Sequence, residues 1–129
     1  MAKYRSPIFD ETVAIARALG DAGRVRALMA LRRGEMCACQ LTELLGLAAS
    51  TVSKHLSILR QARLVEVRRN GRWSYFRRSD DTASPQVRSA LEWLDGALAR
   101  APQILADARR AADIKRFDPV VLCRLQRSR

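Results

Sequence analysis

The strongest structural signal in the chain is the stretch QLTELLGLAASTVSKHLSILRQA, residues 40–62, in which a glycine-containing turn separates two helical patterns. The first pattern places its leucines on one helical face and ends at Gly46, a residue type that favours helix termination. The second pattern follows the segment GLAAS, where Ser50 is a suitable helix cap. Two short helices joined by about three or four residues that include a glycine are typical of a helix-turn-helix.

The second helix of this motif has one apolar and one polar face. Val52, Leu56 and Leu59 fall within a narrow arc of the helical wheel and are predicted to face the core. The opposite side carries small hydroxyls, a lysine and an amide, which can enter the major groove and bond base edges or phosphates. An ordinary solvated helix face is the alternative interpretation, but the neighbouring elements favour DNA binding. The candidate DNA-binding residues of this helix are Ser50, Thr51, Ser53, Lys54, His55, Ser57, Arg60 and Gln61.

Downstream of this helix the pattern changes from a helical to a strand period. The runs LVEVRR and WSYFRR are β-branched or aromatic, and Asn70-Gly71 between them is the strongest two-residue hairpin signal. Residues 60–78 contain seven arginines and one acidic residue. Arginine at a hairpin tip can lie along phosphates or enter the minor groove, so Arg69 and Arg72 join the DNA-binding candidates. Solvated charge that protects an edge strand is the alternative.

Helices are also predicted upstream of the motif. Residues 9–20 place Phe9 and Val13 on one helical stripe, and acidic residues favour the first turn. Asp21 is then the predicted cap of a second helix that stops at Gly34.

A last helix is predicted over residues 85–111, with Pro102 expected to kink or divide it. Its apolar residues form a heptad seam, which we expect to be exposed on a single subunit and covered by a symmetric partner. We therefore predict a mostly α fold: a winged helix-turn-helix with a β-hairpin wing and terminal dimerisation helices over residues 1–112, then a basic tail over 113–129. The seam comprises Val87, Leu91, Leu94, Leu98, Ala101, Leu105 and Ala108.

Composition limits the class of protein. The 129 residues carry 24 Lys and Arg against 13 Asp and Glu, a net charge of +11 that favours a polyanionic partner. No apolar run approaches the about 20 residues that a membrane span needs, and the amino terminus has no signal-peptide core. A cytoplasmic location is therefore expected, in which thiols stay reduced and clustered cysteines indicate metal binding or reactivity more often than a disulfide.

The chain has three cysteines, and two of them, Cys37 and Cys39, stand one residue apart before the helix-turn-helix. Residues i and i+2 point about 200° apart on a helix but share a face in extended chain. The pair can therefore chelate an ion only if residues 36–40 are or become extended, which would compete with the start of the helix. Soft thiolates favour arsenite or antimonite, then cadmium or lead. Small apolar cysteines that fill space behind Met36 are the alternative.

With these residues in view, the chain resembles the ArsR/SmtB family of metal-responsive winged-helix repressors. The resemblance rests on the runs ALGDAGRVRALMAL and GEMCACQLTELLGLAASTVSKHLSILRQARLVEVRRNGRWSYF, and it covers about residues 13–100. It implies a homodimer that binds an inverted-repeat operator in double-stranded DNA and is released when an inducer binds. In the arsenic-sensing branch a Cys-x-Cys motif lies at the first helix of the helix-turn-helix, and Cys37 and Cys39 match it.

The chain departs from the family pattern in two places. The arsenic-sensing branch often has a third cysteine three residues on, where this chain has Thr42. The zinc-sensing branch uses a histidine on the terminal helix, but the only histidine here is His55, so that site is absent. Cys123 in the tail is then the remaining candidate for a third sulfur ligand, from its own subunit or from the partner.

The leading hypothesis is a dimeric repressor of an arsenic-resistance operon that trivalent arsenic or antimony releases. A thiol-based redox or persulfide sensor that uses Cys37 or Cys39 with Cys123 is the main alternative. A sequence-independent architectural DNA binder is another. An enzyme is not expected, since no general base pairs with a cysteine and no catalytic cofactor motif is present.

Overall fold

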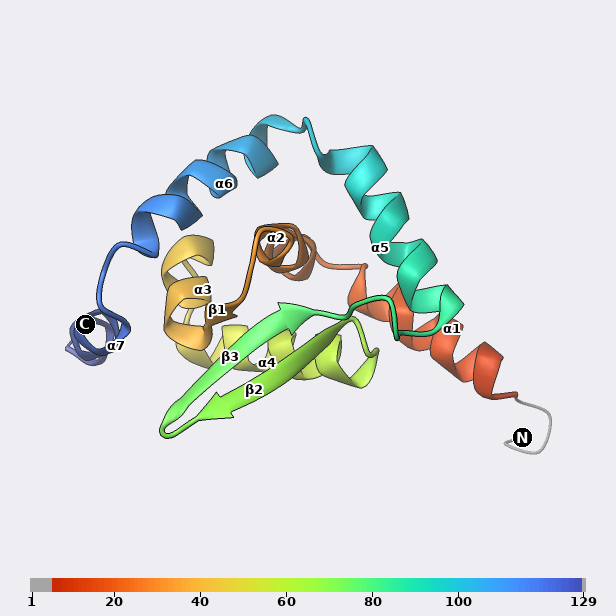
Figure 1. Cartoon of the computed structure of the whole chain (residues 1–129), viewed down its shortest axis with the longest axis horizontal. Helices are drawn as coiled ribbons and strands as arrows, with labels where there is room; N and C mark the ends of the chain where they lie inside the picture. Colours follow the sequence, from red (N-terminus) through yellow and green to blue (C-terminus); the bar gives the residue numbers. More distant parts are fainter. Residues whose placement is uncertain (1–5, 129) are drawn as a thin grey trace.

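The computed structural model describes residues 6–128, which form seven helices and three short strands (Figure 1). The fold is mostly α, as predicted. In chain order the elements are α1 (Pro7–Ala18), α2 (Ala22–Leu31), β1 (Met36–Cys37), α3 (Ala38–Leu45), α4 (Ala49–Gln61), β2 (Val65–Asn70), β3 (Trp73–Arg78), α5 (Pro85–Leu98), α6 (Pro102–Ile114) and α7 (Pro119–Arg127).

Helix α2 lies at the centre, and the other elements surround it (Figure 1). Helices α3 and α4 and the hairpin occupy one side, whereas α5 and α6 form an arc over the opposite side. Most of the largest fully buried side chains come from α2, α3, α4 and β1, and Val87 of α5 joins them, so a single core holds the helix-turn-helix in place. The arrangement is the predicted winged helix-turn-helix.

The two helices of the motif form as predicted, but the second begins earlier. The leucines of α3 are buried, and Gly46 ends the helix in the left-handed region, at φ 66°. The N-cap of α4 is Ala48, whose extended backbone accepts the hydrogen bond from the Val52 N–H. Ser50 lies inside the first turn, so the prediction that it caps α4 was wrong. The turn after Gly46 is shorter than the sequence pattern indicated.

The hairpin is confirmed, with Gly71 and Arg72 as its two turn residues and Asn70 paired with Trp73. Gly71 takes φ 61°, which favours glycine at the first turn position. Strand β1 was not predicted, because two residues show no period. It pairs antiparallel with β3 to give the order β1-β3-β2, and this pairing joins the start of α3 to the wing.

The first half of the terminal seam is not exposed. Val87, Leu91 and Leu94 are only 1, 5 and 3% exposed within one subunit, because α5 packs against α1 and the core. The prediction of an uncovered seam was therefore wrong for this part. The apolar side chains that remain exposed here are Ile8, Phe9 and Val13 of α1 and Trp93 of α5.

The predicted terminal helix is divided at Pro102, which begins α6. The sequence was assigned no helix in the basic tail, but residues 119–127 form α7, which Asp118 caps through the Val120 N–H. Its nine residues are too short to show a clear period. The boundary predicted at residue 112 falls inside α6.

Within residues 6–128 no helix has the length and apolar character that a membrane crossing requires.

Candidate nucleic-acid interface and thiol site

Helix α4 presents a polar face to solvent. Val52, Leu56 and Leu59 are buried against the core, as the helical wheel predicted. The hydroxyls, the lysine and the amide on the other side are free of the subunit's own packing, and Thr51 is half-buried beside them. The exposed predicted residues of this helix are Ser50, Ser53, Lys54, Ser57, Arg60 and Gln61.

His55 does not belong to this exposed face, although it was among the predicted DNA-binding residues. Its ring is 9% exposed and lies between α2 and α4. Nδ1 is 3.3 Å from Nη1 of Arg24, and Nε2 is 3.5 Å from Oδ1 of Asp21. A Cβ at position 23 would lie 3.0 Å from the ring, so Gly23 leaves the space that the imidazole occupies. His55 therefore holds the two helices together.

Asp21, which lies beside His55, is the N-cap of α2, as predicted. Its Oδ1 accepts hydrogen bonds from the N–H groups of Gly23 and Arg24, at 2.7 and 3.2 Å. Desolvation raises the pKa of Asp21, but these two bonds and the charges of His55 and Arg24 outweigh it, so the pKa lies below its ordinary value. The charged carboxylate thus stabilises the start of α2, against which α4 is docked.

The seven arginines of residues 60–78, in the end of α4 and the wing, divide into two groups. Arg68, Arg77 and Arg78 are engaged by the carboxylates of Glu35, Glu66 and Asp95, respectively. Within the described residues, the four other arginines of this segment are exposed and make no carboxylate contact. These four are Arg60, Arg63, Arg69 and Arg72, and three of them were predicted to bind DNA.

Helix α4, with its exposed polar face, lies beside the hairpin that carries Arg69 and Arg72. Figure 1 shows α4 beside the hairpin, away from the arc of α5 and α6, and α4 contacts β2 directly. Hydroxyls and amides are suited to base edges, and arginines are suited to phosphates. The arrangement combines the two kinds of contact that a DNA reader requires.

The thiol site begins where β1 meets α3. Cys37 has an extended backbone, at φ −84° and ψ 165°, and is the N-cap residue of α3. Its N–H donates to Oε1 of Gln40 at 2.9 Å, and the residue is 1% exposed. Cys39 lies inside α3, so the extended conformation that chelation would require is present at Cys37 but not over the whole of residues 36–40.

Cys39 forms a disulfide with Cys123 of α7, 84 residues away, with 5.5 Å between the two Cα atoms. This pairing contradicts the expectation of reduced thiols. It also brings the tail cysteine to α3 of the same subunit, and Cys37 remains a free thiol. Among residues 6–128 no ready-made group of three metal-binding side chains is present. The sequence does contain a sign of the helix that carries Cys123, because Asp118-Pro119 is a typical helix start. It gives no sign of the cysteine with which Cys123 pairs.

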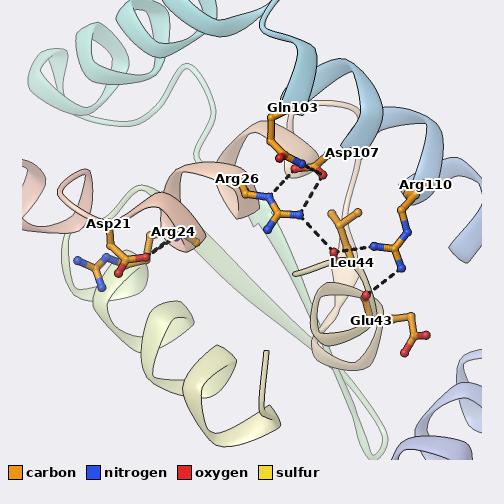
Figure 2. Close-up of polar contacts among 9 residues, drawn as sticks. Asp21, Arg24, Arg26, Glu43, Leu44, Gln103, Asp107 and Arg110 are labelled. Atoms are coloured by element: carbon orange, nitrogen blue, oxygen red, sulfur yellow. Dashed lines mark hydrogen bonds and ion pairs between the residues drawn. The ribbon is translucent and has the colours of Figure 1, made fainter. Parts of the chain in front are cut away.

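A buried polar network attaches α6 to the helix-turn-helix, and sequence reasoning did not find it (Figure 2). Asp107, 3% exposed, accepts two hydrogen bonds from Arg26 of α2, at 2.8 and 3.0 Å. Gln103 donates a third, at 2.9 Å. The bonds to Asp107 hold the pKa of Arg26 above its ordinary value, so the guanidinium stays charged. A charged residue inside a predicted apolar helix gives no sign of its distant partner.

Two arginines satisfy the last carbonyl groups of α3, which have no partner within the helix. Arg110 donates to the carbonyls of Leu44 and Glu43, at 3.1 and 3.2 Å, and Arg26 donates to that of Leu44 at 3.4 Å. Figure 2 shows both guanidinium groups directed at this end of α3. Positive charge is favourable at a helix carboxyl terminus, so α6 stabilises the helix end that leads into α4.

Comparisons with known proteins agree with this architecture. The model of the family described as bacterial regulatory protein, arsR family, matches residues 21–67. The arsenic resistance transcriptional regulator ArsR1 of Pseudomonas putida is 36% identical over 85 residues, which are 65% of this chain and 60% of that protein. The uncharacterized HTH-type regulator MJ1325 of Methanocaldococcus jannaschii is 34% identical over 74 residues, which are 57% of this chain and 83% of that protein.

A solved structure is similar to this chain in both fold and sequence. NolR of Sinorhizobium fredii has a TM-score of 0.52 and 31% identity, and the match covers 75% of this chain and 97% of that chain. The chain spans only about half the length of several other curated relatives that it matches.

Proposed function

The chain belongs to the ArsR family of bacterial regulatory proteins, and from this premise we propose that it is a DNA-binding transcriptional repressor of an arsenic-resistance operon. The observation that carries the proposal is the exposed polar face of α4 in a helix that lies beside the hairpin with its exposed Arg69 and Arg72. A DNA operator as partner implies a cytoplasmic location, which is part of this proposal.

In this proposal α4 enters the major groove and the wing follows the phosphates. Ser53 and Ser57 lie on the exposed face and are short enough for base edges to approach closely, and Lys54 supplies charge. Arg69 and Arg72 are exposed at the end of the hairpin, where phosphates would pass. The net charge of +11 draws the protein to DNA of any sequence, so specificity depends on the serines and the amide.

We further propose that the protein acts as a homodimer on an inverted repeat. The exposed apolar side chains of α1 and the adjacent Trp93 of α5 form a candidate dimer surface, in place of the first half of the terminal seam, which is buried. A two-fold axis would cover this surface on both subunits. It would also set two α4 helices about one turn of DNA apart.

The inducer that we propose is arsenite or antimonite, bound by cysteine thiolates. Relatives from Bacillus subtilis and Escherichia coli, 38 and 31% identical over matched segments, are named arsenical resistance operon repressors. The donor set of this chain is Cys37 and Cys39, with Cys123 as a third sulfur from the same subunit. Soft sulfur donors suit these elements, and no catalytic cofactor is part of the proposal.

Inducer binding must change the start of α3. Cys37 is sealed beneath the surface and Cys39 is held in a helix, so the two thiolates reach one ion only if the first turn of α3 unwinds. Because α3 packs on α4, this change shifts the reading helix relative to the partner subunit. Operator affinity falls because two linked half-sites no longer match.

A release titration tests the proposal. Duplex DNA selected from a random pool by the reduced protein serves as operator, and fluorescence anisotropy follows its release by arsenite, antimonite, cadmium and zinc in parallel. We expect release by arsenite and antimonite at the lowest concentrations. The variants Cys37→Ser and Cys39→Ser should keep operator binding and lose this response. Release that both serine variants retain would place the inducer elsewhere.

A second candidate function is a redox or persulfide-sensing repressor on the same fold, and the Cys39–Cys123 disulfide favours it. Here oxidation itself, rather than arsenite, would release the DNA. Mass spectrometry and anisotropy after oxidant, persulfide or arsenite distinguish the two. Release on formation of the disulfide, without arsenite, would support the second candidate.

A further inference from the structure

The C-terminal arm, defined as α6 and α7 (residues 102–127), holds both ends of α3. At the carboxyl end, Arg110 of α6 binds the last carbonyls of α3, as described above. At the amino end, Nε2 of Gln126 donates to the carbonyl of Cys39 at 2.8 Å, and the same nitrogen is 3.2 Å from Oε2 of Glu43 further along the helix. The Cys39–Cys123 disulfide adds a covalent bond at that same end.

Both thiols of the Cys-x-Cys motif are unavailable while this bond is closed. The sulfur of Cys39 is already bonded to that of Cys123, which lies in α7 and is 6% exposed. Cys37 is a free thiol, but at 1% exposure it lies in the protein interior. Arsenite needs at least two thiolates to displace its hydroxyl groups, and none is presented in this state.

We propose that the Cys39–Cys123 pair is a reversible redox latch that gates the inducer site: when it is closed, the repressor holds its operator and does not respond to arsenite. The latch rests on the proposed function, because it regulates the same cysteines. It differs from the second candidate function, since here oxidation blocks release instead of causing it.

A hydroperoxide is a sufficient oxidant for the closing step. The thiolate of one cysteine attacks the peroxide and breaks the O–O bond, which gives a sulfenic acid and an alcohol or water. The other thiol attacks that sulfur, the S–S bond forms, and water leaves. The two sulfurs lose two electrons together, and the peroxide oxygens gain them. A cellular dithiol reverses the step by thiol–disulfide exchange through a mixed disulfide.

The closed latch keeps the DNA-binding surface intact. In the structure that contains the disulfide, α3 and α4 are packed together and the polar face of α4 is exposed. The latch also opposes unwinding at the start of α3, because the first turn is tied to α7 through Cys39. Inducer binding therefore requires the latch to open before the helix start can change.

The test compares oxidised and reduced wild-type protein on the selected operator. The protein is treated with hydrogen peroxide, excess peroxide is removed with catalase, and mass spectrometry verifies the loss of two hydrogen atoms from one Cys39–Cys123 peptide. We expect equal operator affinity in both forms. The arsenite concentration for half release should rise about tenfold or more in the oxidised form, and a reductant should restore the original value.

Matched variants locate the effect. Cys37→Ser retains both latch sulfurs and should still lose two hydrogen atoms on oxidation, whereas Cys123→Ser should not. Because Cys123 is also a proposed inducer ligand, the variant is compared with itself: Cys123→Ser should release DNA at the same arsenite concentration before and after mild oxidation. A direct readout that is independent of DNA is the alkylation rate of Cys37 by iodoacetamide, which should be slower in the latched wild type than in the reduced protein.

Two results of the release assay would contradict the latch. Equal arsenite sensitivity of the latched and reduced wild type would overturn the latch, and so would DNA release by oxidation alone. If the reduced protein ignores arsenite, the proposed inducer fails. The latch is then judged by the Cys37 alkylation rate, and equal rates in the two forms would overturn it as well.

Discussion

The substitution Asp107→Asn should destabilise the protein, although Asp107 lies far from the DNA-binding face. The carboxylate joins α6 to α2 through Arg26, and Arg26 in turn bonds the last carbonyl of α3. Asparagine keeps the shape and one acceptor oxygen but removes the charge. The guanidinium of Arg26, which is only partly exposed, then loses its counter-charge.

The magnitude follows from the burial of the two partners. Removing one member of a buried ion pair costs about 3–5 kcal/mol. The side chain of Asp107 is 4% exposed, but that of Arg26 is 25% exposed, so water partly compensates the arginine. The remaining amide oxygen also accepts one hydrogen bond, worth about 1 kcal/mol. We therefore expect a loss of about 2–3 kcal/mol in the free energy of unfolding.

Urea denaturation of the reduced protein, followed by far-UV circular dichroism, measures this loss. Asp113→Asn is the matched control, because Asp113 pairs with Arg116 of the same stretch while the two side chains are 70 and 82% exposed. That substitution should change stability little, since exposed pairs are screened by water. The double variant Arg26→Met with Asp107→Leu should recover most of the loss, because apolar residues of similar size can replace a buried pair.

Two results would refute this reasoning. A loss below about 0.5 kcal/mol for Asp107→Asn would mean that the pair contributes no more than an exposed one. A double variant less stable than Asp107→Asn would mean that the bond from Arg26 to the end of α3, and not the charge pair, carries the stabilisation.

Three further predictions concern the DNA face, the subunit contact and pH. Lys54→Ala and Arg72→Ala should weaken binding to all DNA sequences and lower the salt slope by about one each, measured by anisotropy from low to high salt; an unchanged slope would remove the residue from the interface. Trp93→Glu should give folded monomers by sedimentation, whereas Leu94→Glu should unfold the subunit, because these neighbours are 65 and 3% exposed; a folded monomer from Leu94→Glu would contradict the packing of α5. Asp21→Ala should cost about 1 kcal/mol near neutral pH by urea denaturation. Because the pKa of Asp21 is lowered on folding, its contribution to stability is present above the unfolded pKa of about 3.9 and is lost as pH falls through the folded pKa. The cost of the substitution should therefore shrink in acid. A cost that stays constant with pH would mean that the charge of Asp21 does not contribute to stability.

Local patterns were sufficient for the elements that carry the reading surface. The buried leucines of α3, the left-handed Gly46 and the arc of Val52, Leu56 and Leu59 follow from spacing along one helix. The hairpin follows from Asn70-Gly71 and its flanking runs. Such features depend on interactions between residues a few positions apart, and these interactions are the same in any tertiary context.

Contacts between distant segments were decided only by the tertiary structure. The seam on α5 has the same spacing whether it faces α1 or a partner subunit, and packing settled that it is internal. His55 sits at the edge of the polar arc by angle, but the space over Gly23 draws it between two helices. Neither result can be read from a period, because a period specifies a face without specifying what covers it.

The sulfur chemistry shows the same division most clearly. The Cys-x-Cys spacing by itself determined that Cys37 and Cys39 cannot share an ion on a regular helix. Which thiol meets Cys123 depended on the fold, since 84 residues separate Cys39 from Cys123 and α7 has to return to α3. Closing so long a loop requires the packing of the whole arm, including Asp107, Arg110 and Gln126. Spacing in the sequence therefore determined which cysteines cannot act together on one helix, and long-range packing determined which two lie within bonding distance.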